Sequence, residues 1–482
     1  MHTKTTITAL TFGVLGALAV PACDLDVPDL NNPLLDELQE HPTSVNVTGA
    51  TTGLFIGNRR NVAAENGYVD ILGILGREAY NFDSADPRYV GELLGGELSK
   101  GSPYGGNFWG LPYANIRLAN VILDALDKVP SDDLSDLKKT AIKGFVHTIE
   151  ATDLLEVIVA HDTNGAVIDT DQPIAQPNEV QKLGAIVSKE EVYAEIVRLL
   201  ELSITELDQV IAAKGDFPFA FSSGYHNDDK DLTLDTPAGF RKVNRAIRAR
   251  VAAYMEDYDE VLVALGESFI DDSPNPDFRY GAYHVYTTKT GDVTNALNNR
   301  SIYAHPTVKA DAQPDDARYA AKVKDLLDAD GKPRTVMNSG LSTGQTFQMY
   351  NATTPVAIIR NEELILLKAE ALFLKTPSDP VAAATELNLV RTKSGKLTAL
   401  GPAPDRDTFI SQLLYERRFS LLFEGGFRWI DTRRFGRTQD MAHALEAESF
   451  LNVRLPFPLA ECNARPGEPR CDLGSTDTPP GS

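Results

Sequence analysis

Long apolar stretches and positive charge are both scarce in this chain of 482 residues. Beyond the first 22 residues no apolar stretch is long enough to cross a membrane, so we expect the remainder to fold in water. Positive charge is in the minority, with 46 Lys and Arg against 68 Asp and Glu and a formal net charge of −22. This balance argues against partners that are nucleic acids or anionic lipid surfaces.

The chain also lacks the spacings of common catalytic and metal sites. Its eight histidines are scattered without a His-Glu-x-x-His motif, and no Gly-rich phosphate loop is present. Gly340-Leu-Ser-Thr-Gly344 matches a nucleophile elbow, but no helix signal follows it, so we expect a flexible loop. Asp162 to Asp171 lacks the closing Glu of a calcium loop, and we expect a solvated turn. We predict no cofactor, no metal and no enzymatic activity, although paired carboxylates for glycoside cleavage stay open.

The N-terminal residues predict export. Lys4 precedes an apolar run over residues 7–20, and Pro21-Ala22-Cys23 follows it, which resembles a lipobox. We expect a signal peptide at 1–22 and lipid on Cys23; an ordinary signal peptide is the alternative. Residues 23–42, rich in Asp, Asn and Pro, would form a lipidated tether, and 43–482 a single domain.

Only three cysteines are present. With Cys23 assigned to lipid, Cys462 and Cys471 remain, nine residues apart with Pro and Gly between them. In an exported chain such a pair predicts a disulfide that closes a small loop. Metal binding is the less favoured interpretation, because no second Cys or His pair stands nearby.

Helical signals dominate the domain and predict a mainly α fold. Ser188 and Glu191 form a capping box, and Thr236-Pro237 begins a further helix. The helices expected from apolar periodicity cover residues 108–128, 189–211, 237–257, 258–269, 361–374, 380–394 and 407–424. Their pairing across short turns is typical of tetratricopeptide-like hairpins. Residues 271–350 lose this periodicity and predict a long irregular region with a few short strands, which is usually functional at this length.

The segment 360–437 resembles the C-terminal signature of the RagB/SusD family of nutrient-uptake lipoproteins of the outer membrane. It contains Arg360-Asn-Glu-Glu-Leu-Ile-Leu-Leu-Lys-Ala-Glu-Ala-Leu372, Leu387-Asn-Leu-Val-Arg391, Tyr415-Glu-Arg-Arg418 and Phe423-Glu-Gly-Gly-Phe-Arg-Trp-Ile-Asp-Thr-Arg-Arg434. Residues 109–120 and 454–458 are similar to that family as well. The resemblance implies a SusD-like frame of helical hairpins that supports a loop-rich ligand region. It also implies a TonB-dependent, SusC-like barrel transporter as the partner.

Five charged residues of this signature stand at spacings that suit a buried ionic network between helices. We favour this interpretation over catalysis, because buried charges must be paired. These residues are Glu416, Arg417, Glu424, Arg428 and Asp431.

Two aromatic-rich stretches, near residues 80–109 and 278–303, are candidates for sugar recognition. Aromatic rings stack on the apolar C–H groups of a sugar while charged and amide groups bond its hydroxyls. We expect Phe82, Phe108, Trp109 and Tyr113 to belong to the core. The residues expected to bind ligand are Tyr80, Asp86, Arg88, Tyr89, Tyr104, Tyr283 and Tyr286.

The sequence therefore predicts a cell-surface binding lipoprotein of the outer membrane, held there by its lipid anchor alone. It would capture oligosaccharides or peptides and deliver them to the barrel transporter. Two alternatives stay open, an exported polysaccharide hydrolase and a helical-repeat scaffold that binds only proteins.

Overall fold

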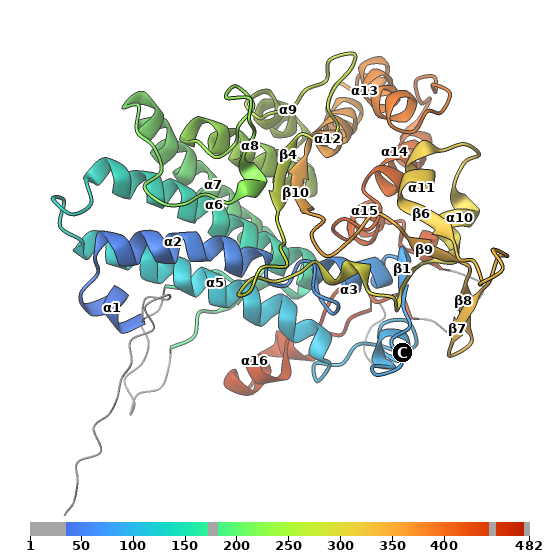
Figure 1. Cartoon of the computed structure of the whole chain (residues 1–482), viewed down its shortest axis with the longest axis horizontal. Helices are drawn as coiled ribbons and strands as arrows, with labels where there is room; N and C mark the ends of the chain where they lie inside the picture. Colours follow the sequence, from blue (N-terminus) through green and yellow to red (C-terminus); the bar gives the residue numbers. More distant parts are fainter. Residues whose placement is uncertain (1–34, 172–181, 443–449, 477–482) are drawn as a thin grey trace, which may run out of the picture.

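The structure, a computed structural model, describes residues 35–171, 182–442 and 450–476. Helices predominate in these ranges, so the prediction of a mainly α fold is confirmed (Figure 1). The helices are α1 (Leu35–Glu40), α2 (Ser44–Arg59), α3 (Tyr68–Leu75), α4 (Arg88–Gly91), α5 (Pro103–Lys128), α6 (Asp136–His161), α7 (Lys189–Ala212), α8 (Pro237–Tyr254), α9 (Tyr258–Gly266), α10 (Pro306–Asp311), α11 (Ala317–Lys322), α12 (Asn361–Leu374), α13 (Pro380–Lys393), α14 (Arg406–Ser420), α15 (Phe427–Arg434) and α16 (Leu459–Ala464).

Local capping signals set the starts of several helices where the sequence predicts them. The Ser188 hydroxyl accepts from the Glu191 amide while the Glu191 carboxylate accepts from the Ser188 amide, which is the capping box of α7. Thr236 caps α8 with Pro237 in its first turn. Helix α5 begins at Pro103, earlier than the predicted Phe108, because Ser102 caps it there. These helix starts are set by a few adjacent residues, so they can be predicted from the sequence.

Helices that follow one another along the chain pack as hairpins. Helix α5 packs on α6, α6 on α7, α7 on α8 and α8 on α9, and a second group joins α12 to α13 and α14. Figure 1 shows α2, α5, α6 and α7 side by side in one half of the molecule. The hairpins form a rigid frame with one large apolar core, and a smaller core lies between α12, α13 and α14.

Residues 271–350 are mostly irregular, as predicted, with short strands in two-stranded antiparallel ladders. The ladders pair β1 with β5, β4 with β10, β2 with β3, β6 with β9 and β7 with β8. The strands are β1 (Ala79–Asn81), β2 (Ala166–Val167), β3 (Ile186–Val187), β4 (Gly281–His284), β5 (Ile302–Ala304), β6 (Val323–Asp325), β7 (Val336–Asn338), β8 (Leu341–Thr343), β9 (Gln345–Phe347) and β10 (Val356–Arg360). Ser342 of the elbow-like motif thus lies in a β-hairpin, not in the flexible loop expected.

The two ends of the domain differ in how far the structure describes them. Cys23 and the predicted signal peptide lie outside the described residues. Part of the predicted tether, Leu35–Glu40, is helix α1, and its Leu38 is buried in the core. Near the C-terminus a disulfide joins Cys462 to Cys471. Arg470 of the closed loop donates to the carbonyls of Asn164 and Val187, so the loop is fixed against the β2–β3 ladder.

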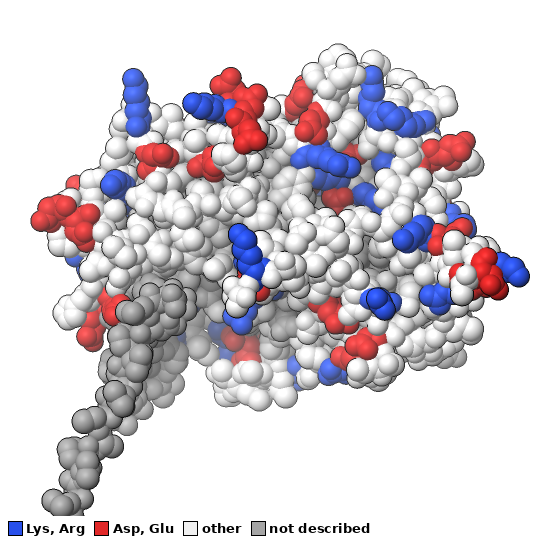
Figure 2. All heavy atoms as spheres, in the orientation of Figure 1, with Lys and Arg blue, Asp and Glu red and all other residues white. Residues whose placement is uncertain are grey.

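The surface carries both signs of charge. On the face drawn in Figure 2, Lys and Arg are scattered among Asp and Glu and do not gather into a basic patch. Within the described ranges, no helix combines the length and apolar character needed to span a bilayer.

The buried ionic network predicted for the C-terminal signature is present. Glu416 accepts from Arg318 at 2.6 Å and from Arg391 at 2.7 Å. Arg417 donates to Asp431 at 2.6 Å. Burial alone would raise the pKa of Glu424, but Arg360 and Lys322 lower it to about 2.

Arg428 departs from that prediction. Its guanidinium donates to the backbone carbonyls of Gly76 and Arg77 at 2.8 and 2.9 Å and to that of Asp440. It therefore fixes α15 to the turn after α3 instead of joining a carboxylate. A buried cation can be satisfied by convergent carbonyl oxygens, which the spacing of charged residues does not reveal.

Candidate functional site

The β1–β5 ladder brings the two aromatic stretches of the sequence together. Tyr80 lies opposite Tyr303 in this antiparallel pair, and the amide of Phe82 donates to the carbonyl of Ser301 at 2.8 Å. The Phe82 ring is 5.1 Å from that of Tyr80 and 5.7 Å from that of Tyr303. Tyr80 is fully buried, while Phe82 and Tyr303 are half-buried at the end of this stack. We call Phe82 and Tyr303 the ring pair.

Asp83 and Asn299 stand close in sequence to the two rings, and Glu65 lies near both of these side chains. Asp83 follows Phe82 directly, and its carboxylate accepts from the amide of Ala85. Burial and the charge of Asp83 raise the pKa of Glu65, and the side chain of Asn299 lies close enough to oppose this shift.

Asp86 and Arg88 follow in the same segment, where the amide of Asp86 donates to the carbonyl of Asp83 at 3.3 Å. Arg88 is exposed and donates two hydrogen bonds of 2.7 Å to Asp86. These bonds lower the pKa of Asp86 and keep it ionised. The guanidinium also covers the ring of Tyr104 at 5.8 Å. A planar, satisfied ion pair of this kind offers fixed donors and acceptors to a ligand.

Most of the tyrosines predicted to line the site are in the core instead. Tyr80, Tyr89, Tyr104 and Tyr286 are 0%, 4%, 1% and 4% exposed. Tyr80 packs between Phe82 and His305, and Tyr89 packs on Tyr104. Their ring faces are occupied by protein, so none of these rings is open to a ligand.

Tyr283 is half-buried but lies on another ladder. It belongs to β4, which pairs with β10, and its hydroxyl donates to the carbonyl of Arg279. Asp86 and Arg88 thus follow Phe82 by four and six residues in the chain, whereas Tyr283 lies on a different ladder. Of the four aromatics expected in the core, Phe108 and Trp109 are buried, while Tyr113 and Phe82 are half-buried.

The ring pair itself was not among the predicted ligand residues. Phe82 was assigned to the core, and Tyr303 was only one member of an aromatic stretch. The available signal was the polar residues beside each ring, Asp83 after Phe82 and Arg300-Ser301 before Tyr303. That signal gains meaning only when the two strands are known to pair.

Metal and nucleophile chemistry find no matching geometry in the described ranges. No three His, Cys, Asp or Glu side chains there are grouped so that they could hold a metal ion. Asp162, at the start of the calcium-like segment, pairs with Lys189 and Arg433. Its carboxylate is thus paired with protein cations, and residues 164–167 are buried, so this part of the segment is not the solvated turn expected.

Both the sequence and the fold of this chain are similar to those of known proteins. Residues 266–456 match the model of the SusD family. No curated protein matches the chain. Among solved structures, surface glycan-binding protein A from Bacteroides uniformis is 16% identical with a TM-score of 0.65, covering 90% of this chain and 99% of that one.

Two further structures share the fold. A SusD superfamily protein from Bacteroides vulgatus is 14% identical with a TM-score of 0.64, covering 89% of this chain and 98% of that one. A laminarin-binding SusD-like protein is 15% identical with a TM-score of 0.60, covering 88% and 98%. Residues 266–456, which include the signature at 360–437, match the SusD family model, and the fold is shared with these solved structures along nearly the whole described chain.

Proposed function

We propose that this protein binds an oligosaccharide at the ring pair without cleaving it and passes it to a TonB-dependent, SusC-like barrel transporter. The observation that carries the proposal is the pair of half-buried rings, Phe82 and Tyr303, 5.7 Å apart at the β1–β5 ladder, with Asp83 directly after Phe82. Rings of this kind cover the apolar face of a sugar while the polar rim bonds its hydroxyls. Two proteins of the same fold are described, one as surface glycan-binding and one as laminarin-binding, which supports the ligand class.

Removal of either ring should weaken glycan binding about tenfold. Aromatic contacts contribute about 0.5–1.5 kcal/mol beyond the area they bury, and about 1.4 kcal/mol is a factor of ten in affinity. Isothermal titration of the wild type against laminarin oligosaccharides, other glycans and peptides identifies the ligand. The same titration is then made with Phe82→Ala, Tyr303→Ala and the double variant, which should show no binding.

Tyr258→Ala serves as the matched control, because this half-buried ring lies at the start of α9, away from the ring pair. It should bind like the wild type. Unchanged affinity in the double variant would move the site elsewhere. New reducing ends during incubation would favour a hydrolase, and capture of the transporter with no small ligand bound would favour a scaffold.

The anchor is the second part of the proposal. A lipid on Cys23 would hold the domain at the outer membrane. Digestion of the domain by protease added to intact cells would show that it faces outward. Cys23→Ala should shift the protein from the detergent-extracted membrane fraction to the soluble fraction, because acyl chains supply the membrane affinity. Equal membrane retention of both proteins would contradict lipidation at this residue.

A further inference from the structure

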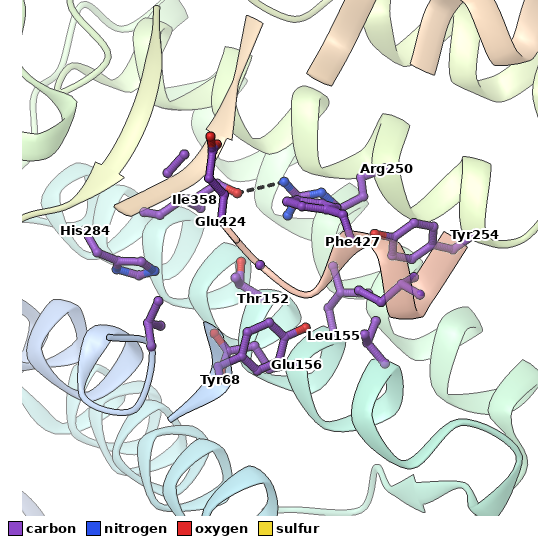
Figure 3. Close-up of a pocket in the computed structure, with 15 residues that line it drawn as sticks. Tyr68, Thr152, Leu155, Glu156, Arg250, Tyr254, His284, Ile358, Glu424 and Phe427 are labelled. Atoms are coloured by element: carbon purple, nitrogen blue, oxygen red, sulfur yellow. Dashed lines mark hydrogen bonds between the residues drawn. The ribbon is translucent and has the colours of Figure 1, made fainter. Parts of the chain in front are cut away.

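A second cavity lies inside the frame, apart from the ring pair. It has a volume of about 70 Å³ and is enclosed by α3, α6, α8, the β4–β10 ladder and the segment that enters α15. Figure 3 shows Thr152, Leu155 and Glu156 of α6 on one side with Tyr68, and Arg250, Tyr254 and Phe427 on the other. Neither Phe82 nor Tyr303 lines it.

Several polar side chains in this cavity have no protein partner. Within the described parts of the chain, no hydrogen bond to another protein group is made by the carboxyl of Glu156, the hydroxyls of Tyr68 and Tyr254, or the imidazole of His284, and all four line the cavity. Polar groups in a protein interior are nearly always satisfied. Four such groups around one space are therefore satisfied by what fills it, either water or a ligand that forms hydrogen bonds.

The charges that reach the cavity are already compensated. Arg250 donates to both oxygens of Glu363, at 2.7 and 2.6 Å, and to the carbonyl of Ile358 at 2.8 Å. Glu424 is paired with Arg360 and Lys322. An ion entering this space would lack a counter-charge among these residues, and a buried unpaired ion is strongly disfavoured.

The unpartnered groups are neutral as well. Burial raises the pKa of Glu156 well above its ordinary value, and the neighbouring Asp153 acts in the same direction. Burial and the charge of Arg59 lower the pKa of His284 to about 3. The wall thus presents a carboxyl whose neutral form is favoured by burial, two phenols and a neutral imidazole, which together both donate and accept.

The other part of the wall is apolar. Leu155, Val159 and Ile430 face the same space. A water molecule needs two to four polar partners, so water alone is poorly held against these side chains. A small polyol offers hydroxyls to the polar wall and C–H groups to the apolar wall, and the volume corresponds to about five water-sized positions.

We propose that this cavity is a second binding site, for one neutral polyol of about the size of glycerol, held by Tyr68, Glu156 and Tyr254. Its ligand is bound independently of the glycan at the ring pair. Glycerol is the probe, and its binding to the whole protein is followed by saturation-transfer NMR.

Matched substitutions separate hydrogen bonding from packing. Glu156→Gln keeps a neutral donor and acceptor and should leave glycerol affinity within about twofold, whereas Glu156→Leu, of similar size, should weaken it about tenfold or more. Tyr68→Phe with Tyr254→Phe removes two hydroxyls, keeps both rings and should also weaken it about tenfold or more. Each single tyrosine variant supplies the test if the double variant fails to fold.

Two controls distinguish this site from the ring pair. Phe82→Ala should leave glycerol binding unchanged, and the tyrosine variants should leave glycan binding unchanged. The proposal is overturned if the wild type shows no glycerol transfer, if the tyrosine variants bind like the wild type, or if a crystal soaked in glycerol shows only water in the cavity.

Discussion

Glu416→Ala should lower the free energy of unfolding by about 3–5 kcal/mol, because it leaves two buried guanidiniums without their shared carboxylate. Glu416 is fully buried in α14 and accepts from both Arg318 and Arg391. Neither arginine loses all its bonds: Arg318 still pairs with Asp316, and Arg391 still donates to Gln313. The uncompensated positive charge is nevertheless buried. Urea unfolding followed by circular dichroism measures the resulting loss in the free energy of unfolding.

An exposed acid on the same helix provides the comparison. Asp407 lies in the first turn of α14, with a side chain that is 86% exposed. Asp407→Ala should change stability by about 0.5 kcal/mol or less, as surface ion pairs usually do. If Glu416→Ala stays within about 1 kcal/mol of the wild type, the network is not the stabilising element between α13 and α14 that its geometry implies.

Much of the helical frame could be predicted from local sequence signals. The capping box at Ser188, Pro237 after Thr236 and the periodic segment from Asn361 each act over a few residues, so their helices appear where expected. The helix predicted over 407–424 ends at Ser420, before the Gly425-Gly426 pair. Gly426 has a φ of 69° and an added Cβ would collide with Leu72, so the pair in fact forms the tight entry to α15.

Helix α6 shows why other parts were missed. No helix was predicted between residues 128 and 188, although Asp136–His161 is among the longest in the described chain. From Gly144 to Leu155 every residue is buried, including Glu150 and Asp153. A helix buried on all sides has no apolar stripe, so periodicity does not reveal it.

The candidate site was missed for a different reason. Phe82 and Tyr303 are brought together only by the β1–β5 ladder, which joins residues more than two hundred positions apart. The strands have three residues each, too few for a clear alternation of apolar and polar side chains. Residue types indicated sugar recognition, but which rings remain open depends on long-range packing.

The buried carboxyl of Asp153 in α6 should make the free energy of unfolding depend on pH. This carboxyl is 1% exposed and accepts from the side-chain amides of Asn58 and Asn115, each at 2.7 Å. Burial outweighs these bonds and raises its pKa from 3.8 to about 7. The folded protein therefore keeps a proton that the unfolded chain has released above about pH 4. This contribution to stability is complete below pH 4 and is lost as the pH rises to about 7.

Asp153→Asn should remove this dependence, because an amide does not titrate. The difference in unfolding free energy between variant and wild type should change by about 4 kcal/mol from pH 4 to pH 8, in favour of the variant at high pH. The Oδ1 of Asn115 has no partner and can accept from the new amide once the Asn115 side chain turns over. Urea unfolding across this range measures the effect, with the exposed Glu190→Gln in α7 as control. Parallel curves for the variant and the wild type would show that Asp153 is ionised in the folded protein, so that burial on α6 does not hold its proton.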